Sequence, residues 1–204
     1  INIPAKVVSG DFYNFSDLGN NKFGFGVADV SGKGIKSSLL MSKASSLYRC
    51  LSKTIFSASS LLKILNDEIC ETTTRGMFVT MIVGVYDKNK NELLLSNAGH
   101  EPPLIFSSDG NFKTVDEADP PLGIAPNFKF TEQIISFKES SMYIFTDGIT
   151  EMKNTNGDML GQEGFQDYIK KYQSTPNNKR LQKIIEDLIS SGRIQKDDLT
   201  IVTV

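Results

Sequence analysis

A central run of strand-like segments lies between two pairs of amphipathic, helix-like segments, and this order restricts the fold more than any other property of the sequence. The clearest strand is the β-rich segment Met77–Tyr86, which the polar turn Asp87–Asn91 connects to a returning strand, Glu92–Ala98. A polar turn between two β-rich segments is typical of an antiparallel hairpin. Further strands are predicted at Phe23–Ala28, Leu104–Phe106, Phe128–Phe137, Ser141–Phe145 and Leu199–Val204.

Amphipathic helices are predicted on both sides of this run. The first carries one apolar stripe at helical spacing, formed by Leu40, Ala44, Leu47, Tyr48 and Leu51. A second is predicted to begin at Ser59 or Ser60, whose hydroxyl can cap free N–H groups, and two more cover Gln162–Tyr172 and Lys179–Ser190. This order favours an α+β fold with antiparallel sheets and flanking helices over a regular βαβ alternation. Since no linker or repeat divides the chain, we expect one domain over residues 1–204.

The charge balance excludes several classes of partner. The chain has 22 Lys and Arg residues against 24 Asp and Glu residues, a formal charge of −2. Proteins that bind nucleic acids or membrane surfaces through charge carry an excess of positive residues, so neither partner is expected. The longest apolar stretch, Met77–Tyr86, is about half the ~20 residues that a transmembrane helix needs. We therefore expect no membrane contact by this domain.

The chain start and the cysteines bear on its context. Because the first residue is Ile1 rather than Met, we expect the C-terminal, catalytic part of a longer protein with an upstream domain. Cys50 and Cys70 have neither Cys-x-x-Cys spacing nor a histidine nearby in sequence, which argues against a zinc or redox site. The interpretation is two reduced thiols in or near the core of a cytoplasmic protein, which upstream segments could tether to a membrane.

Several aspartates stand at the ends of apolar strands, in polar or glycine-containing loops: Asp11, Asp29, Asp147, Asp197 and Asp198. Carboxylates gathered at one rim would repel each other, and a hard divalent ion such as Mg²⁺ or Mn²⁺ would neutralise them. The alternative is that they are caps and turn formers that never meet, because aspartate is common in turns. Spacing alone does not bring them together.

The glycine-rich turn Ser31–Gly34 precedes the first predicted helix but matches neither nucleotide-binding pattern. A P-loop requires G-x-x-x-x-G-K-[ST], and here a glycine follows Lys33. The Rossmann pattern G-x-G-x-x-G fails because Gly24 and Gly26 are followed by Asp29. The glycines would instead let the backbone approach a metal ion or a phosphate closely.

Five motifs in order span the chain from about Val8 to Val204: Gly10–Tyr13, Ala28–Gly34, Asn97–Pro103, Phe145–Gly148 and Asp197–Thr200. Together they resemble the bacterial branch of the metal-dependent serine/threonine phosphatases of the protein phosphatase 2C superfamily. This branch includes the stage II sporulation E phosphatase and the stress-response regulators of sigma factors. The resemblance implies an αββα sandwich, in which two packed antiparallel sheets are flanked by helices.

The same resemblance implies a site for two Mn²⁺ or Mg²⁺ ions. Asp29 would bridge the two ions and the backbone carbonyl of Val30 would be a further ligand. Asp147 and Asp197 would bind the first ion and Asp11 the second, so that Asp29 and Asp147 are the expected catalytic residues. Whether the adjacent Asp198 shares the site or binds through water stays open at this point.

The implied activity is hydrolysis of phosphoserine or phosphothreonine in a protein, by a metal-activated water. The implied substrate is an anti-sigma-factor antagonist or a similar signalling protein, and an upstream sensor or a homodimer partner could act through the helix after the Asp29 loop. A catalytically weak pseudophosphatase is the alternative, favoured only by Asn14, where relatives often have an acidic residue. His100, the single histidine, is either a structural or substrate-edge residue or a general acid.

Overall fold

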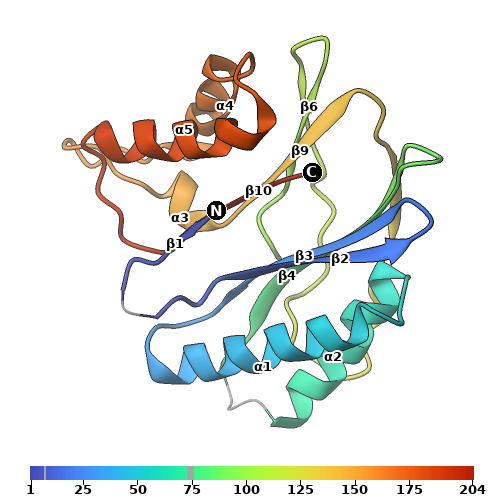
Figure 1. Ribbon diagram of the computed structural model, residues 1–204. Helices are drawn as coiled ribbons and strands as arrows, with labels where there is room; N and C mark the ends of the chain where they lie inside the picture. Colours follow the sequence, from blue (N-terminus) through green and yellow to red (C-terminus); the bar gives the residue numbers. More distant parts are fainter. Residues whose placement is uncertain (7, 73–75) are drawn as a thin grey trace.

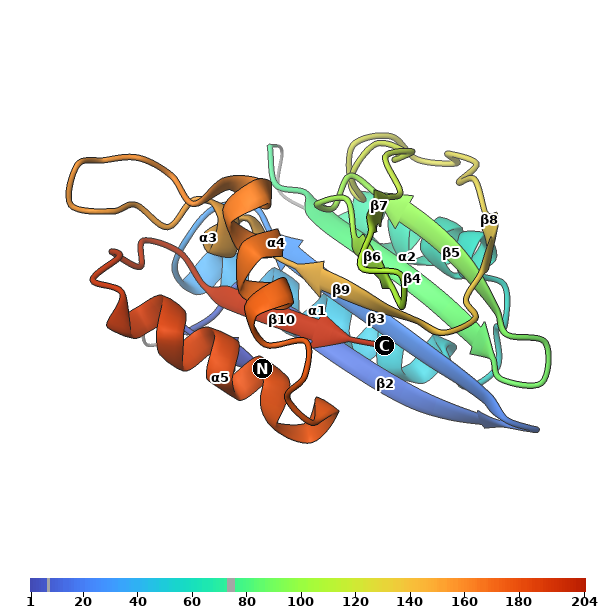
Figure 2. The ribbon, with the colours of Figure 1, turned by 90° about the horizontal axis from the view of Figure 1, so that it is seen from above.

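The computed structural model describes residues 1–6, 8–72 and 76–204, and two five-stranded antiparallel sheets form its centre (Figure 1, Figure 2). The β10 sheet has the strand order β1 (Asn2–Ile3), β10 (Leu199–Thr203), β9 (Ser140–Phe145), β6 (Leu104–Ser107) and β7 (Phe112–Thr114). The β3 sheet has the order β2 (Phe12–Gly19), β3 (Lys22–Val30), β4 (Val79–Asp87), β5 (Glu92–Ala98) and β8 (Gln133–Ser136).

Helices cover the outer face of each sheet, as Figure 1 shows. The β3 sheet is covered by α1 (Ile35–Leu51) and α2 (Ala58–Thr72), and the β10 sheet by α4 (Gly161–Lys171) and α5 (Asn177–Ser190). The one-turn helix α3 (Asp147–Thr150) follows β9 directly. This arrangement confirms the predicted αββα sandwich.

Side-chain alternation along the central strands produces three apolar layers. Met81 packs toward α1 and α2, whereas its neighbour Ile82 packs between the two sheets. On β9, Ile144 joins the inter-sheet layer and Phe145 packs toward α4 and α5. Each central strand is therefore buried on both faces, which explains why these segments are almost continuously apolar in sequence.

The predicted stripe of α1 is confirmed. Leu40, Ala44 and Tyr48 are buried against the β3 sheet, and Leu47 and Leu51 pack partly buried beside them. The predicted hairpin of the central run is also present, with Asp87 opposite Glu92 where β4 turns into β5.

Two predicted boundaries are wrong, and one long strand was missed. α2 begins at Ala58, ahead of the predicted start, because the Ser57 hydroxyl accepts a hydrogen bond from the Ser60 N–H (3.2 Å). The predicted strand Phe128–Phe137 is confined to β8, since Thr131 N–H donates to the Asp119 side chain (2.6 Å) rather than to a strand. β2 was missed because it is an edge strand, in which half-buried and exposed residues alternate after Phe12 and several of them are polar.

Cys50 is exposed, so its predicted place in or near the core is wrong, whereas Cys70 is half-buried; both thiols are free. Within the described residues, none of the helices has the length and apolar character needed to cross a bilayer.

Candidate metal centre

Strand pairing brings the motif aspartates to one end of the sandwich. Asp11 precedes β2 and Asp29 lies near the end of β3, and the antiparallel register pairs Phe12 with Ala28. In the other sheet, the end of β9 lies beside the start of β10, with Phe145 opposite Ile201. Each sheet therefore delivers its carboxylates to the same end.

In the β10 sheet, Asp147 follows the end of β9, and Asp197 and Asp198 precede β10. Gly148 allows the two segments to come this close. A Cβ atom placed on Gly148 would collide with the main chain of Asp198, whose carbonyl carbon would lie 3.0 Å from it. The Phe145–Gly148 motif therefore needs glycine after the aspartate because backbone occupies the space of a side chain.

Asp11 connects the two sheets. It is buried, and its Oδ2 atom accepts hydrogen bonds from the hydroxyls of Thr146 (2.8 Å) and Thr200 (2.6 Å), both from the β10 sheet. These hydroxyls fix one oxygen of the carboxylate and leave the other available for a further partner.

Asp198 makes a different set of contacts. Its Oδ1 atom accepts the Ala5 N–H (2.7 Å), and its Oδ2 atom accepts the Gly10 N–H (2.7 Å) and the Ser9 hydroxyl (2.8 Å). Asp198 is buried and therefore anchors the segment that leads into Asp11. With both oxygens engaged by protein donors, its contacts are those of a positioning residue.

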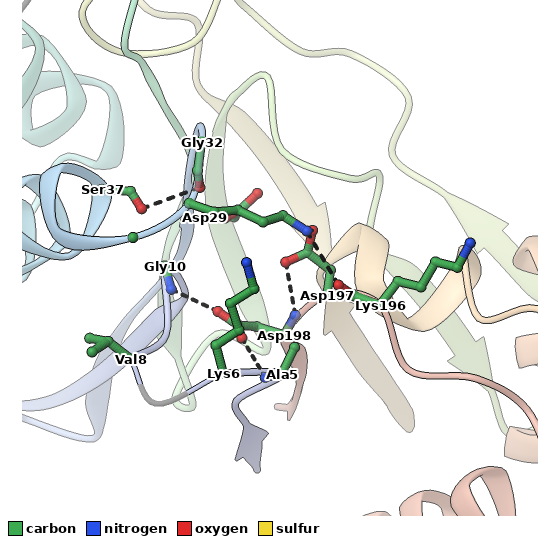
Figure 3. A pocket seen from close by; sticks show the side chains of 12 residues that line it. Ala5, Lys6, Val8, Gly10, Asp29, Gly32, Ser37, Lys196, Asp197 and Asp198 are labelled. Carbon is green, nitrogen blue, oxygen red and sulfur yellow. Dashed lines mark hydrogen bonds and ion pairs between the residues drawn. The ribbon is translucent and has the colours of Figure 1, made fainter.

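Asp29 lies between two pockets. One is lined by Gly10, Lys33, Asp197 and Asp198 together with Asp29, and Figure 3 shows Asp29, Asp197 and Asp198 in it. The other is lined by Asp29, Thr80, His100 and Asp147, among others.

The predicted backbone ligand lies beside Asp29. A Cβ atom on Gly10 would lie 3.3 Å from the Val30 carbonyl oxygen and 3.5 Å from Asp29 Oδ1, so these two oxygens flank the same small space. The Thr80 hydroxyl donates to the Asp29 carbonyl oxygen (3.3 Å) and holds this end of β3 against β4.

The proximity of the carboxylates perturbs their acidity. Burial first, and then the negative charge of Asp29, raise the pKa of Asp11 to about 8. Burial and the charge of Asp29, followed by smaller contributions from Glu151 and Asp197, raise the pKa of Asp147 to about 6. The pKa of Asp29 itself is raised by burial and by the charge of Asp197. The cluster thus carries more negative charge than its surroundings neutralise.

Such a donor set fits divalent cations. Mg²⁺ and Mn²⁺ prefer carboxylate and carbonyl oxygens, and a cation would relieve the repulsion that raises these pKa values. As the side chains stand, however, no three His, Cys, Asp or Glu residues within 1–6, 8–72 and 76–204 are placed close enough together to hold one ion. Binding would therefore require side-chain movement, for which the half-exposed Asp197 has room.

His100 is buried and neutral. Burial lowers its pKa to about 4, its Nδ1 atom is 3.2 Å from the Thr80 hydroxyl, and its Nε2 atom has no partner among the described residues. The Asn97 side chain closes the turn around it, since its Oδ1 atom accepts the His100 N–H (2.8 Å) and its amide donates to the His100 carbonyl (3.0 Å). These contacts favour the structural interpretation, because a neutral imidazole is a poor acid.

Four hydroxyl residues of the site were given no role from the sequence, namely Ser9, Thr80, Thr146 and Thr200. Three of them lie within two residues of a motif aspartate, and this adjacency is the signal that could have identified them. Asn14, in contrast, lies within β2 opposite Gly26, three residues beyond Asp11.

Comparison with known proteins gives a consistent assignment. Residues 19–204 match the family model described as "Stage II sporulation protein E (SpoIIE)". The chain is 29% identical over 205 residues to phosphoserine phosphatase RsbU of Bacillus subtilis (strain 168), covering 99% of this chain and 61% of RsbU. The chain therefore spans about three-fifths of the length of that relative.

Solved structures share the fold. The SiaA-PP2C domain of Pseudomonas aeruginosa superposes with a TM-score of 0.86 at 17% identity, covering 100% of this chain and 84% of that domain. The PP2C phosphatase domain of SpoIIE from Bacillus subtilis, with a fragment of its regulatory domain, gives a TM-score of 0.81 at 20% identity, covering 99% and 61%. The resemblance inferred from the five motifs is thereby confirmed, and the chain belongs to the stage II sporulation protein E (SpoIIE) family.

Proposed function

We propose that this domain is a metal-dependent serine/threonine phosphoprotein phosphatase. The observation that carries the proposal is the convergence of Asp11, Asp29 and Asp147, from both sheets, with pKa values raised by burial and by neighbouring carboxylates. Perturbed carboxylates in a pocket are typical of functional sites, and this set has the chemistry of a divalent-cation site.

Asp11, Asp29, Asp147, Asp197 and the Val30 carbonyl would hold two Mg²⁺ or Mn²⁺ ions. Such ions activate water for attack on a phosphate ester and stabilise the negative charge that develops on the phosphoryl oxygens. Asp198 stands apart from this set, because both of its oxygens accept hydrogen bonds from residues 5–10.

The chain's own contacts prepare the site. Thr146 and Thr200 orient the Asp11 carboxylate, and Thr80 holds the backbone at Asp29. Gly10 leaves open the space beside Asp29 and the Val30 carbonyl. Preorganised groups of this kind lower the reorganisation that a reaction requires.

The substrate and the cellular setting are further parts of the proposal. Since RsbU is named a phosphoserine phosphatase, we infer a phosphorylated serine or threonine in a signalling protein, such as an anti-sigma-factor antagonist. These 204 residues would form one domain of a longer cytoplasmic protein, since the chain spans 61% of RsbU, and an upstream sensor domain or a homodimer partner would control it.

Hydrolysis of p-nitrophenyl phosphate and of a phosphoserine peptide, with Mn²⁺, Mg²⁺ or a chelator, tests the proposal. We expect turnover that requires the divalent ion and is lost in the Asp29→Asn variant. Asp116→Asn is the matched control, because Asp116 is exposed and lies outside both pockets. Turnover that survives chelation would refute the metal-dependent mechanism, and no turnover with any ion would support the pseudophosphatase alternative.

A further inference from the structure

Lys33 forms an ion pair with one of the proposed metal ligands. Its Nζ atom lies 2.6 Å from Asp197 Oδ2 and 3.2 Å from the Lys196 carbonyl oxygen. The side chain therefore spans the pocket from the loop after β3 to the segment before β10. The ammonium group of Lys33 thus lies between the Asp197 carboxylate and the pocket.

Both oxygens of Asp197 are engaged in this arrangement. Oδ1 accepts the Asp198 N–H (3.0 Å), and Oδ2 accepts the Lys33 ammonium group. A divalent ion that binds Asp197 would meet the lysine charge at short range, and two cations at one carboxylate repel each other. Lys33 and the ion are thus alternative partners of the carboxylate.

The lysine is free to leave. Its side chain is 48% exposed, and its neighbours Gly32 and Gly34 have φ angles of 86° and 94° with open space around them. Because about half of the side chain is exposed, the ammonium group can turn toward solvent without displacing other residues.

We propose that Lys33 is an internal counter-ion of Asp197, which occupies this carboxylate until a divalent cation displaces the lysine. The inference rests on the proposed function, since it requires Asp197 to be a metal ligand. It also rests on the direct ion pair, in which the ammonium group of Lys33 occupies the Asp197 oxygen that faces the pocket. Lys33 then sets the affinity of the site for metal without being a ligand itself.

Displacement of Lys33 is tested by measuring Mn²⁺ affinity. Electron paramagnetic resonance measures free Mn²⁺ during titration of the wild type and of two variants. Lys33→Met keeps the aliphatic stem and removes the competing charge, so Mn²⁺ affinity should rise by up to about fivefold, the range expected for a partly exposed ion pair. Lys6→Met is the matched control, because Lys6 lines the same pocket but has no ion pair in the part of the chain that the structure describes. It should change the affinity by less than about twofold, because its charge is screened.

Unchanged or weaker Mn²⁺ binding in Lys33→Met, or an equal gain in both variants, would overturn the role of Lys33. If the wild type and both variants bind no Mn²⁺, the proposed metal site itself fails and the inference fails with it. Nitrogen-detected NMR of the lysine ammonium groups gives a second readout. Saturation with Mg²⁺ should remove the hydrogen-bonded signal of Lys33 and leave that of Lys63, which pairs with Asp67 on α2 (2.9 Å), and persistence of the Lys33 signal would contradict displacement.

Discussion

Replacement by alanine should have different effects at the adjacent residues Asp197 and Asp198, with a loss of turnover at the first and a loss of stability at the second. Asp198 is buried and accepts three hydrogen bonds from residues 5–10, whereas the Asp197 side chain is 41% exposed and pairs with a flexible lysine. We expect Asp198→Ala to destabilise the fold strongly and Asp197→Ala to leave stability almost intact while abolishing metal-dependent turnover.

The expected magnitude follows from the contacts of Asp198. Hydrogen bonds to a charged acceptor contribute about 1.5 kcal/mol or more each, so three could contribute about 4–5 kcal/mol. Because Ala5 is exposed and Ser9 is half-buried, their freed donors can reach water, and we take about 3 kcal/mol as the loss. For a domain of this size, that loss lowers the melting temperature by about 6–12 °C. Removing the exposed ion pair of Asp197 should cost about 1 kcal/mol or less.

Urea unfolding of both variants should be measured in the presence of a chelator, so that cation binding does not contribute to the free energy of unfolding. Equal losses for the two variants, or a loss below about 1 kcal/mol for Asp198→Ala, would refute the division of roles between the anchoring and the exposed aspartate. Turnover of p-nitrophenyl phosphate with Mn²⁺ completes the comparison, because Asp197→Ala should be folded and inactive.

Three further outcomes are expected. Gly148→Ala should reduce the free energy of unfolding by about 1–3 kcal/mol, because the new methyl group would press on the Asp198 main chain, and urea unfolding at the wild-type level would contradict that contact. Since the pKa of Asp11 is raised to about 8, the folded state binds the proton more tightly than the unfolded state, so the stability of the metal-free protein due to this group should fall as the pH rises from about 4 toward 8. Unfolding in a chelator at several pH values should show a shallower decline for Asp11→Asn, and an identical slope would count against the shift. Asp29→Asn should abolish turnover more completely than His100→Ala, and similar residual rates in the aryl phosphate assay would contradict the central place of Asp29.

Much of the fold could be predicted because residues that face a packed layer are apolar at the spacing of the helix or strand that carries them. The stripe through Leu40, Ala44 and Tyr48 and the continuous apolar run of β4 both face packed layers, and both were predicted. β2 escaped because an edge strand has one open side and tolerates residues such as Asn14 and Asp17. The limits of β8 also escaped, since they depend on a hydrogen bond from Thr131 to the distant Asp119 side chain.

The site was predictable only through motif order. Position in sequence cannot show that residues 11, 29, 147 and 197 meet, because their meeting depends on which strands pair and at which register. The assignment of Asp198 stayed open for the same reason, since its partners lie almost the whole chain length away, at Ala5, Ser9 and Gly10. The structure identifies these partners and shows that the contacts of Asp198 differ from those of Asp197.

The acidic end of the molecule is divided between the two halves of the sandwich, with Asp11 and Asp29 attached to one sheet and Asp147 and Asp197 to the other. An ion held by both halves would cross-link the two sheets, so its affinity would depend on how the sheets are placed relative to each other. Substitutions deep in the inter-sheet layer, for example at Ile82 or Ile144, can then retune metal affinity from a distance.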